Sequence, residues 1–437
     1  MKGNPFILLI LVAMTPFLLF AVIIVGTGYG LVAWQPPVLW QHFSGSSGST
    51  TVIASDPSGV YAQGYLNGSF EKSKGILFLD KHGTDGGTVW TRNIGDTNDT
   101  VFNAISVGTE GIYLSGFNVT GTQRAILQKY DLTGAKVWEQ DFLASASLEG
   151  VGAISDTSRG VYVTGISGPV TNQSYTGGVS WVRNYDSAGN VVWTSEYSND
   201  TTTFNGVYAS TSGVYVSYYA VNRTRNLGSF LVKLDMSGSF VWNHYVGGGV
   251  ANGIAGDSTG IYLSGTSSGP SAYISKYDFG GNQIWMTSIA SPDLTPIGAD
   301  TPLSLDSSGV YISIATDVAH EFLQKYDLYG RRVWSFQFQS PTHDENGFTA
   351  FRLSTSSGTV YVAGSIYSEG NTLALVGALG SSSSLVFFGI NPPWSFMILG
   401  GLIGGSAISI ITFRRLQRGR ARPTRTRREQ RTLPTKD

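Results

Sequence analysis

The side chains that could do acid–base or metal chemistry are few in this sequence and widely scattered. Its five histidines include no two at the spacing of metal ligands: His42, His82, His244, His320 and His343. No Asp-x-Asp loop indicates calcium, and the acidic residues of the long loops have no fixed partner: Asp293, Asp300, Asp344 and Glu345. His42 and His244 each follow a tryptophan by two residues, which favours a structural place on a strand. We therefore predict no catalytic residue, no metal site and no cofactor.

Asparagine supplies the remaining candidate sites, as acceptors for glycans. Six Asn-x-Ser/Thr motifs begin at Asn67, Asn98, Asn118, Asn172, Asn199 and Asn222. Each could carry a glycan if the chain is exported in an organism with that machinery. A chain rich in Ser and Thr forms several such motifs by chance, so their placement is more informative than their number.

The overall composition indicates many short strands rather than a set of separate domains. The 437 residues include 56 Gly and 12% aromatic residues, and only 13% are charged, where about 25% is usual. There is no Cys, which excludes a disulfide framework, a thiolate metal site and a Cys nucleophile. This even composition predicts one large repetitive body.

Two short motifs repeat along the chain with a period of roughly 40 to 50 residues, as in propeller blades or solenoid coils. The first, Gly-(Val/Ile)-Tyr, begins at Gly59, Gly111, Gly160, Gly213, Gly260 and Gly309, with Thr359 starting a variant seventh copy. The second, Asp-x-x-Gly-x-x-x-Trp, begins at Asp131, Asp186, Asp235, Asp278 and Asp327. The segment from Asp80 to Trp90 is interpreted as a lengthened sixth copy.

Each unit contains four short apolar or alternating runs, which predict four strands, here called a, b, c and d. In the second unit these runs are residues 103–107, 111–116, 125–131 and 137–142. The Asp-x-x-Gly element predicts a tight c–d turn, with Asp bonded to nearby backbone and Gly at positive φ. The tryptophan that follows is expected to pack between neighbouring sheets. The predicted fold is all-β: a seven-bladed β-propeller of four-stranded blades, flanked by two transmembrane helices.

The residues before the turn resemble a known repeat family. The relevant segments are Gln128-Lys129-Tyr130-Asp131, Ser275-Lys276-Tyr277-Asp278, Gln324-Lys325-Tyr326-Asp327 and Val232-Lys233-Leu234-Asp235. Over about residues 38–380 the pattern resembles the β-propeller repeat family of the SBBP type, which implies a surface or secreted propeller with no single assigned activity. A weaker resemblance is to quinoprotein dehydrogenases, whose blades carry an Asp-to-Trp docking motif, but those resemble eight-bladed rings with a vicinal disulfide.

The two ends of the repeat region complement each other. After the c-like run at 372–378 the last unit lacks its Trp strand, whereas Val38, Leu39 and Trp40 precede the first unit. We therefore expect residues 38–44 to complete the last blade and leave no open sheet edge. The alternative is that residues 385–388 supply this strand.

Two uncharged apolar segments, residues 6–25 and 394–413, are each long enough to cross a bilayer. For the first, a cleaved signal peptide is the alternative. Residues 414–437 hold ten Lys and Arg against two acids, which predicts a cytoplasmic tail. The expected layout is a cytoplasmic N-terminus and signal anchor (1–34), an extracellular propeller (35–380), a linker (381–393), a second membrane helix (394–413) and a basic cytoplasmic tail (414–437). The tail could bind anionic lipid.

Strand direction separates the loops into two sets, because a–b and c–d turns share one face and b–c and d–a loops share the other. The chain enters and leaves at the a–b/c–d face, so we expect this face to look toward the membrane. All six sequons fall on the opposite face, as do the longest connections, 167–178, 290–301 and 339–349. A binding patch is expected there over units five to seven.

The expected function is a membrane-anchored extracellular binding or surface-scaffold module, with an unknown protein or glycan ligand and no nucleic acid. One alternative is a propeller enzyme, carbohydrate-active or a quinoprotein-like oxidoreductase, with a site built from loops. Another is a sensor that couples an external ligand to the basic tail. Acidic residues converging on the central channel would favour the enzyme, and a channel of Ser, Gly and aromatic residues would favour binding.

Overall fold

The computed structural model describes residues 32–67, 75–119, 124–141, 148–168, 170–171, 174–175, 179–197, 201–221, 226–267, 271–289, 301–315, 321–337, 348–368, 371–380 and 384–387. The chain divides into two compact units, Pro36–Ser383 and a smaller unit of Met1–Gln35 with Ser384–Asp437. In the smaller unit, β1 (Val32–Gln35) pairs antiparallel with β31 (Ser384–Phe387). Within the described ranges, no helix is long and apolar enough to span a membrane. The predicted spans and basic tail lie outside the described residues.

The Pro36–Ser383 unit is built from antiparallel sheets. Five described sheets have four strands each: β6 (Thr100–Gly108), β7 (Gly111–Asn118), β8 (Arg124–Tyr130) and β9 (Lys136–Asp141); β10 (Leu148–Thr157), β11 (Gly160–Gly168), β14 (Val179–Tyr185) and β15 (Val191–Tyr197); β16 (Thr201–Ser210), β17 (Gly213–Val221), β18 (Asn226–Leu234) and β19 (Phe240–Gly247); β20 (Ala251–Asp257), β21 (Gly260–Thr266), β22 (Ala272–Tyr277) and β23 (Gln283–Ile289); β24 (Leu303–Asp306), β25 (Gly309–Ala315), β26 (Glu321–Tyr326) and β27 (Arg332–Gln337). A small hairpin, β12 (Val170–Thr171) with β13 (Ser174–Tyr175), lies between β11 and β14. The four strands expected in the second repeat unit are confirmed.

One further sheet has seven strands, in the order β28 (Phe348–Ser356), β29 (Thr359–Ser368), β30 (Asn371–Gly380), β2 (Val38–Asp56), β3 (Gly59–Leu66), β4 (Ile76–Gly83) and β5 (Thr88–Asp96). Its centre is the long strand β2, which serves two neighbours in turn. The first half of β2 pairs with β30 and the second half with β3.

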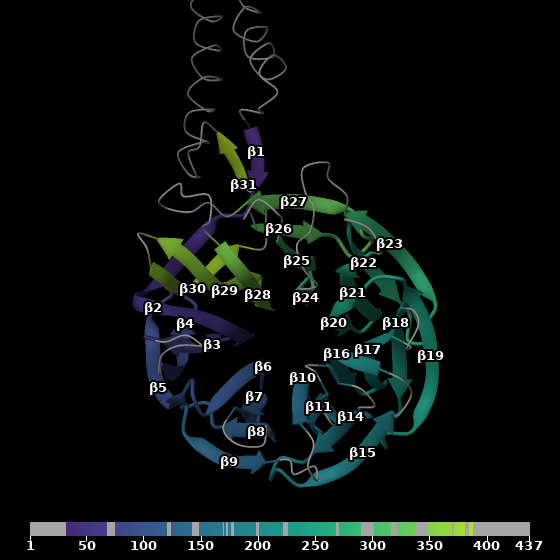
Figure 1. Cartoon of the computed structure of the whole chain (residues 1–437). Coiled ribbons are helices and arrows are strands. Elements are labelled where there is room, and N and C mark those ends of the chain that lie inside the picture. Colours follow the sequence, from purple (N-terminus) through teal and green to yellow (C-terminus); the bar gives the residue numbers. More distant parts are fainter. Residues whose placement is uncertain are drawn as a thin grey trace, which may run out of the picture. The chain divides into compact units, whose positions relative to one another are not determined.

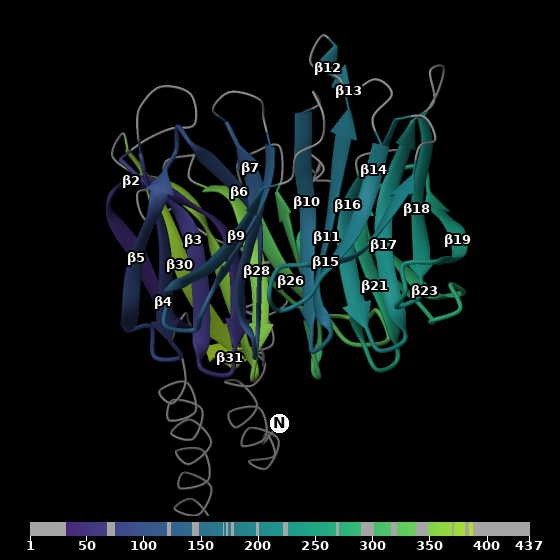
Figure 2. The same ribbon diagram turned by 90° about the horizontal axis from the view of Figure 1, so that it is seen from below.

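The sheets of this unit follow one another around a common centre, in a β-propeller-like arrangement (Figure 1). The first strands β6, β10, β16, β20, β24 and β28 lie nearest the centre, and the fourth strands lie at the rim. Seen from the side, the strands run between the two ends of the ring (Figure 2). The apolar core lies between consecutive sheets: Leu77 and Leu79 pack with Ile112 and Ile126 of the next sheet.

Burial follows the place of each strand within its sheet. The second strand is covered on both faces, and the first six residues of β3, β7 and β21 are all buried. Such a strand is apolar without alternation, since neither face meets water. The fourth strand is an edge with one neighbour, and β9, β15 and β23 alternate between exposed and partly buried positions.

The expected c–d turn is present. In the second sheet Asp131 Oδ1 accepts hydrogen bonds from the Thr133 hydroxyl and from the N–H groups of Thr133 and Ala135. Gly134 has φ 82°, a conformation that favours glycine. These hydrogen bonds, led by that from the Thr133 side chain, hold the pKa of Asp131 below its usual value. The carboxylate is therefore engaged in shaping the turn.

The tryptophan of each motif fastens its sheet to the next turn along the ring. Trp90 Nε1 donates to Leu132 O at 3.3 Å, and Trp138 Nε1 donates to Ser187 O at 3.0 Å. A Cβ built on Gly134 would lie 2.9 Å from the Trp90 ring, so the glycine also leaves room for the indole. The expectation that these tryptophans pack between sheets is confirmed.

The first unit departs from the prediction at its turn. Asp80 lies within β4, and the turn begins at Gly83, whose carbonyl accepts the Gly86 N–H at 3.0 Å. Gly83, Gly86 and Trp90 have the spacing of the other copies, so the interpretation of a lengthened motif starting at Asp80 was wrong. Glycine simply replaces the aspartate.

The N-terminal strand completes the last sheet, as expected. Trp40 pairs with Ala378 in β30, and its Nε1 donates to Thr84 O of the next turn at 3.0 Å. Gly380 N donates to Pro37 O at 2.9 Å, so the chain enters and leaves this unit side by side. The alternative strand at 385–388 is wrong, because Ser384–Phe387 pairs with β1 instead.

Candidate functional site

Each inner strand carries an irregularity near its start. In β6 the pairing with β7 skips one residue between Phe102 and Ala104, which leaves Asn103 as a β-bulge. Equivalent shifts in β2, β10, β16 and β20 leave out Thr51, Gly152, Asn205 and Asn252. A bulge re-aims side chains locally. Here bulges recur at one level around the centre of the ring.

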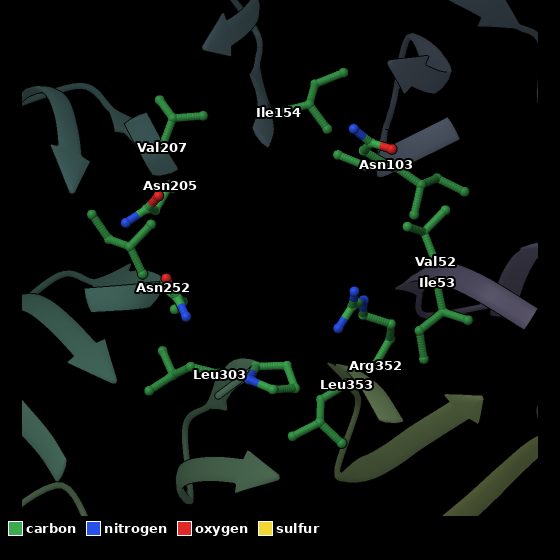
Figure 3. Close-up of a pocket in the computed structure, with 16 residues that line it drawn as sticks. Val52, Ile53, Asn103, Ile154, Asn205, Val207, Asn252, Leu303, Arg352 and Leu353 are labelled. Carbon is green, nitrogen blue, oxygen red and sulfur yellow. The ribbon is translucent and has the colours of Figure 1, made fainter. Parts of the chain in front are cut away.

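These strands surround a cavity of about 240 Å³ on the axis of the ring (Figure 3). Its lining comes from β2, β6, β10, β16, β20 and β28 and from Pro302 and Leu303 at the start of β24. One level is aliphatic, with a branched side chain from every inner strand: Ile53, Ile105, Ile154, Val207, Ile254, Leu303 and Leu353. The bulge level adds polar groups: Asn103, Asn205, Asn252 and Arg352.

The polar groups of the cavity differ in their partners. Asn205 Nδ2 donates to Ala251 O at 3.2 Å and thereby ties β16 to the neighbouring sheet. The Nδ2 atom of Asn252 is buried without an acceptor in the described part of the chain. The same holds for the hydroxyl of Thr301, which occupies the bulge position before β24. A buried donor without a partner is costly unless water or a ligand accepts its hydrogen bond.

Charge within the cavity has a single sign among the described lining residues. Arg352 is the one charged side chain among them, and none of them is acidic. The axis therefore matches neither expected pattern: it has no converging carboxylates, and Ser and aromatic residues do not line it. It combines an aliphatic ring, asparagine amides and one guanidinium group.

The sequence contained a signal for this site that the repeat analysis did not use. The residue six positions before each repeat glycine, or before Thr359, is Ile, Val or Leu in all seven units. The position eight before holds Asn in three units, namely Asn103, Asn205 and Asn252. Stacking the units on their glycines would have identified both levels of the cavity wall.

The lysine of the Lys-x-Asp element takes part in packing. Lys129 pairs with Tyr113 on one side and Trp138 on the other, with its Nζ 5.4 Å from the Tyr113 ring centre. The two rings are 6.0 Å apart. A cation over an aromatic face is attracted to it. This element therefore stabilises the blade interior and lies away from the cavity.

The structure brings together two histidines that are far apart in the sequence. His42 of β2 and His82 of β4 have ring centres 5.2 Å apart, near Asp80. Burial, followed by the charge of His42, lowers the pKa of His82 to about 4. Burial raises the pKa of Asp80 to about 6, against a hydrogen bond from Thr91 and the charge of His42.

The other chemically capable residues do not extend this pair. His244 stacks edge-on against Trp242 at 4.9 Å and lies over Gly281, which fits the expected structural role. In the described residues no three His, Asp, Glu or Cys side chains group as metal ligands. The remaining candidates lie outside the described residues: His320, His343, Asp293, Asp300, Asp344 and Glu345.

Three of the six predicted glycan acceptors lie in the described residues, at the same end of the ring. Asn67 is exposed just after β3, and Asn98 is exposed in the turn between β5 and β6. Asn118 ends β7, and the N–H of Val119 donates to Asp99 O at 2.9 Å. These positions are b–c and d–a connections, as expected. Asn172, Asn199 and Asn222 lie outside the described residues.

Comparison with known proteins adds little about function. No protein-family model and no curated protein matches the chain. Three solved structures resemble it at low identity. A protein of unknown function from Bacteroides caccae is 13% identical, with 63% of this chain and 94% of that chain covered and a TM-score of 0.38. The polysaccharide lyase Uly1 is 9% identical, with 76% and 90% covered and a TM-score of 0.46. A subtype N10 neuraminidase-like protein of A/little yellow-shouldered bat/Guatemala/060/2010 is 12% identical, with 80% and 100% covered and a TM-score of 0.41.

Proposed function

We propose that this chain is a surface binding module whose recognition site is the polar end of the axial cavity. The observation that carries the proposal is the buried, unpartnered amide of Asn252 beside a cavity lined by every inner strand. Concave sites with a mostly apolar wall and a few polar groups are the usual form of small-ligand sites. The absence of acidic side chains from the described lining supports binding in preference to acid–base catalysis.

The architecture behind this proposal is a seven-bladed ring. The seven-stranded sheet counts as two blades that share β2, so the N-terminal strand closes the last blade on the first. This count agrees with the seven copies of the Gly-(Val/Ile)-Tyr motif. The resemblance to SBBP-type repeats, which implies a surface propeller without an assigned activity, fits the same proposal.

Substitution of Asn103 by tryptophan tests the position of the site. Asn103 is an exposed bulge residue whose side chain lines the cavity, so an indole there should fill the space without entering the sheet core. We expect small molecules that copurify with the intact chain, measured by native mass spectrometry, to be lost from this variant. The matched control is Glu110→Trp, an exposed position at the opposite end of the β6–β7 hairpin. Retention of the same molecules by Asn103→Trp would place the site elsewhere.

We also propose that the ring is held outside a membrane by the segments at 6–25 and 394–413, with both termini cytoplasmic. Gly380 and Pro37 adjoin at the a–b/c–d end of the ring, so both connections to these segments leave from one end. That end would face the bilayer, and the three described sequons would face away from it. The basic tail would then lie beside anionic lipid.

Protease treatment of intact cells tests this topology. The ring should be removed while an epitope tag after Asp437 stays protected. A second tag inserted after Gly68, beside the Asn67 sequon, provides the internal control and should be lost. Loss of the C-terminal tag from unbroken cells would contradict the proposed orientation.

A further inference from the structure

Arg352 breaks a pattern that the other six units keep. The residue that follows the bulge on each inner strand is Val52, Ala104, Ala153, Gly206, Gly253 or Pro302, and in the last unit it is Arg352. Six copies of the unit fold with a small or apolar residue at this place. The fold therefore does not require a long cationic side chain here.

The direction of the side chain strengthens this point. Arg352 reaches toward the middle of the cavity, and the amide of Asn252 reaches in from the opposite side (Figure 3). Arg352 also makes a contact within the protein, but a guanidinium group has five donors, so one contact leaves others for a ligand. The groups that face each other across the cavity are thus a cation and an N–H donor.

A site of this composition selects a ligand by charge. Hydrogen bonds from charged donors to carboxylate are about twice as strong as neutral ones. The Nδ2 of Asn252 is buried without a partner, and an anion would accept its hydrogen bond. The described lining offers a cationic ligand no carboxylate to pair with.

The aliphatic level fixes the other half of the ligand. The branched side chains of the seven inner strands follow the polar level by one or two residues, a distance of about 3 to 7 Å along a strand. A cavity of about 240 Å³ holds roughly eight water molecules at about 30 Å³ each. A ligand of similar volume has roughly eight non-hydrogen atoms.

We propose that the cavity binds a small organic carboxylate, with its anionic group between Arg352 and Asn252 and its apolar part against the aliphatic ring. This inference rests on the proposed function of the same cavity and adds the chemical class of its ligand. It is consistent with the patch expected over units five to seven, because Asn252 belongs to the fifth unit and Arg352 to the seventh.

Three probes of equal length separate charge from apolarity: hexanoate, hexanol and hexylammonium. Binding to the full-length chain in detergent is measured by calorimetry near neutral pH. We expect hexanoate to bind at least tenfold more tightly than either other probe. From propionate to hexanoate the affinity should rise by up to about fourfold for each methylene group. Equal binding of hexanoate and hexanol would overturn the proposal.

Variants assign the charge selection to Arg352. Arg352→Gln should weaken hexanoate binding at least tenfold and leave hexanol binding unchanged, while Arg352→Lys should retain part of the preference. Arg159→Gln removes an exposed arginine in an a–b turn and should bind hexanoate as the natural chain does. Melting without ligand shows whether each variant is folded.

The outcomes also separate this inference from the proposed function. If Asn103→Trp removes copurifying molecules while Arg352→Gln binds hexanoate unchanged, the cavity is a binding site and the carboxylate assignment is wrong. If Asn103→Trp retains those molecules and hexanoate binding too, both proposals fail.

Discussion

Replacing Trp40 with alanine is expected to lower the free energy of unfolding by about 3 kcal/mol, in the range measured for large aromatic residues in cores. The indole is half-buried between the last and first sheets, with its centre 6.1 Å from those of Tyr361 and His82. It also donates to Thr84 O, and that bond would be lost. Trp40 holds the strand that closes the ring, so its loss would loosen a sheet edge.

Denaturant unfolding and hydrogen exchange would measure this effect. The melting transition should fall, and exchange should increase in residues 38–47 and 371–380, which pair across the closure. Leu39→Ala is the matched control, because Leu39 neighbours Trp40 on the same strand and is 51% exposed. An unchanged melting temperature for Trp40→Ala would mean that the N-terminal strand does not secure the ring.

The closure was predictable from sequence because it depends on a count. Seven units with one missing Trp strand, and one Trp strand without a unit, allow a simple match. The turn of the first unit was misread because Gly83 stands where the other units have aspartate. Spacing back from Trp90 would have identified it, since the docking of the indole preserves that distance even when the turn residue changes.

The cavity was not predicted, although its residues follow the repeat. Bulges leave no mark in hydrophobic periodicity, and Asn103, Asn205 and Asn252 resemble ordinary polar strand residues. Arg352 becomes distinctive only when the units are compared position by position. Alternation of strand direction, by contrast, correctly grouped Asn67, Asn98 and Asn118 at one end of the ring.

The pair of His42 and His82 illustrates what topology alone supplies. Forty residues separate them, and each resembles an isolated surface histidine in the sequence. They meet because β2 belongs to the last sheet in its first half, where it faces β4 of the first sheet. The same junction buries Asp80, so ionisable groups are concentrated where the ring closes.

Stability near this junction should depend on pH through two opposing groups. The pKa of Asp80 is raised to about 6 in the folded state, so its stabilising contribution is complete below about pH 4 and is lost as pH rises through about 6. The pKa of His82 is lowered to about 4, so the unfolded chain binds the proton first and stability is lost as pH falls from about 6.5 to 4. In the natural chain these slopes largely cancel.

Substitution of Asp80 by asparagine should remove one slope and expose the other. Near neutral pH the variant should be more stable by about 2 kcal/mol, allowing for solvent screening, because no carboxylate is then buried. Between about pH 6.5 and 4 it should lose a similar amount, about 2 kcal/mol, through His82 alone. The partner variant His82→Gln leaves Asp80 alone and should become more stable over the same descent. Urea unfolding across this pH range measures all three proteins. If Asp80→Asn has the same pH profile as the natural chain, Asp80 is ionised alike in the folded and unfolded states and the buried carboxylate costs nothing.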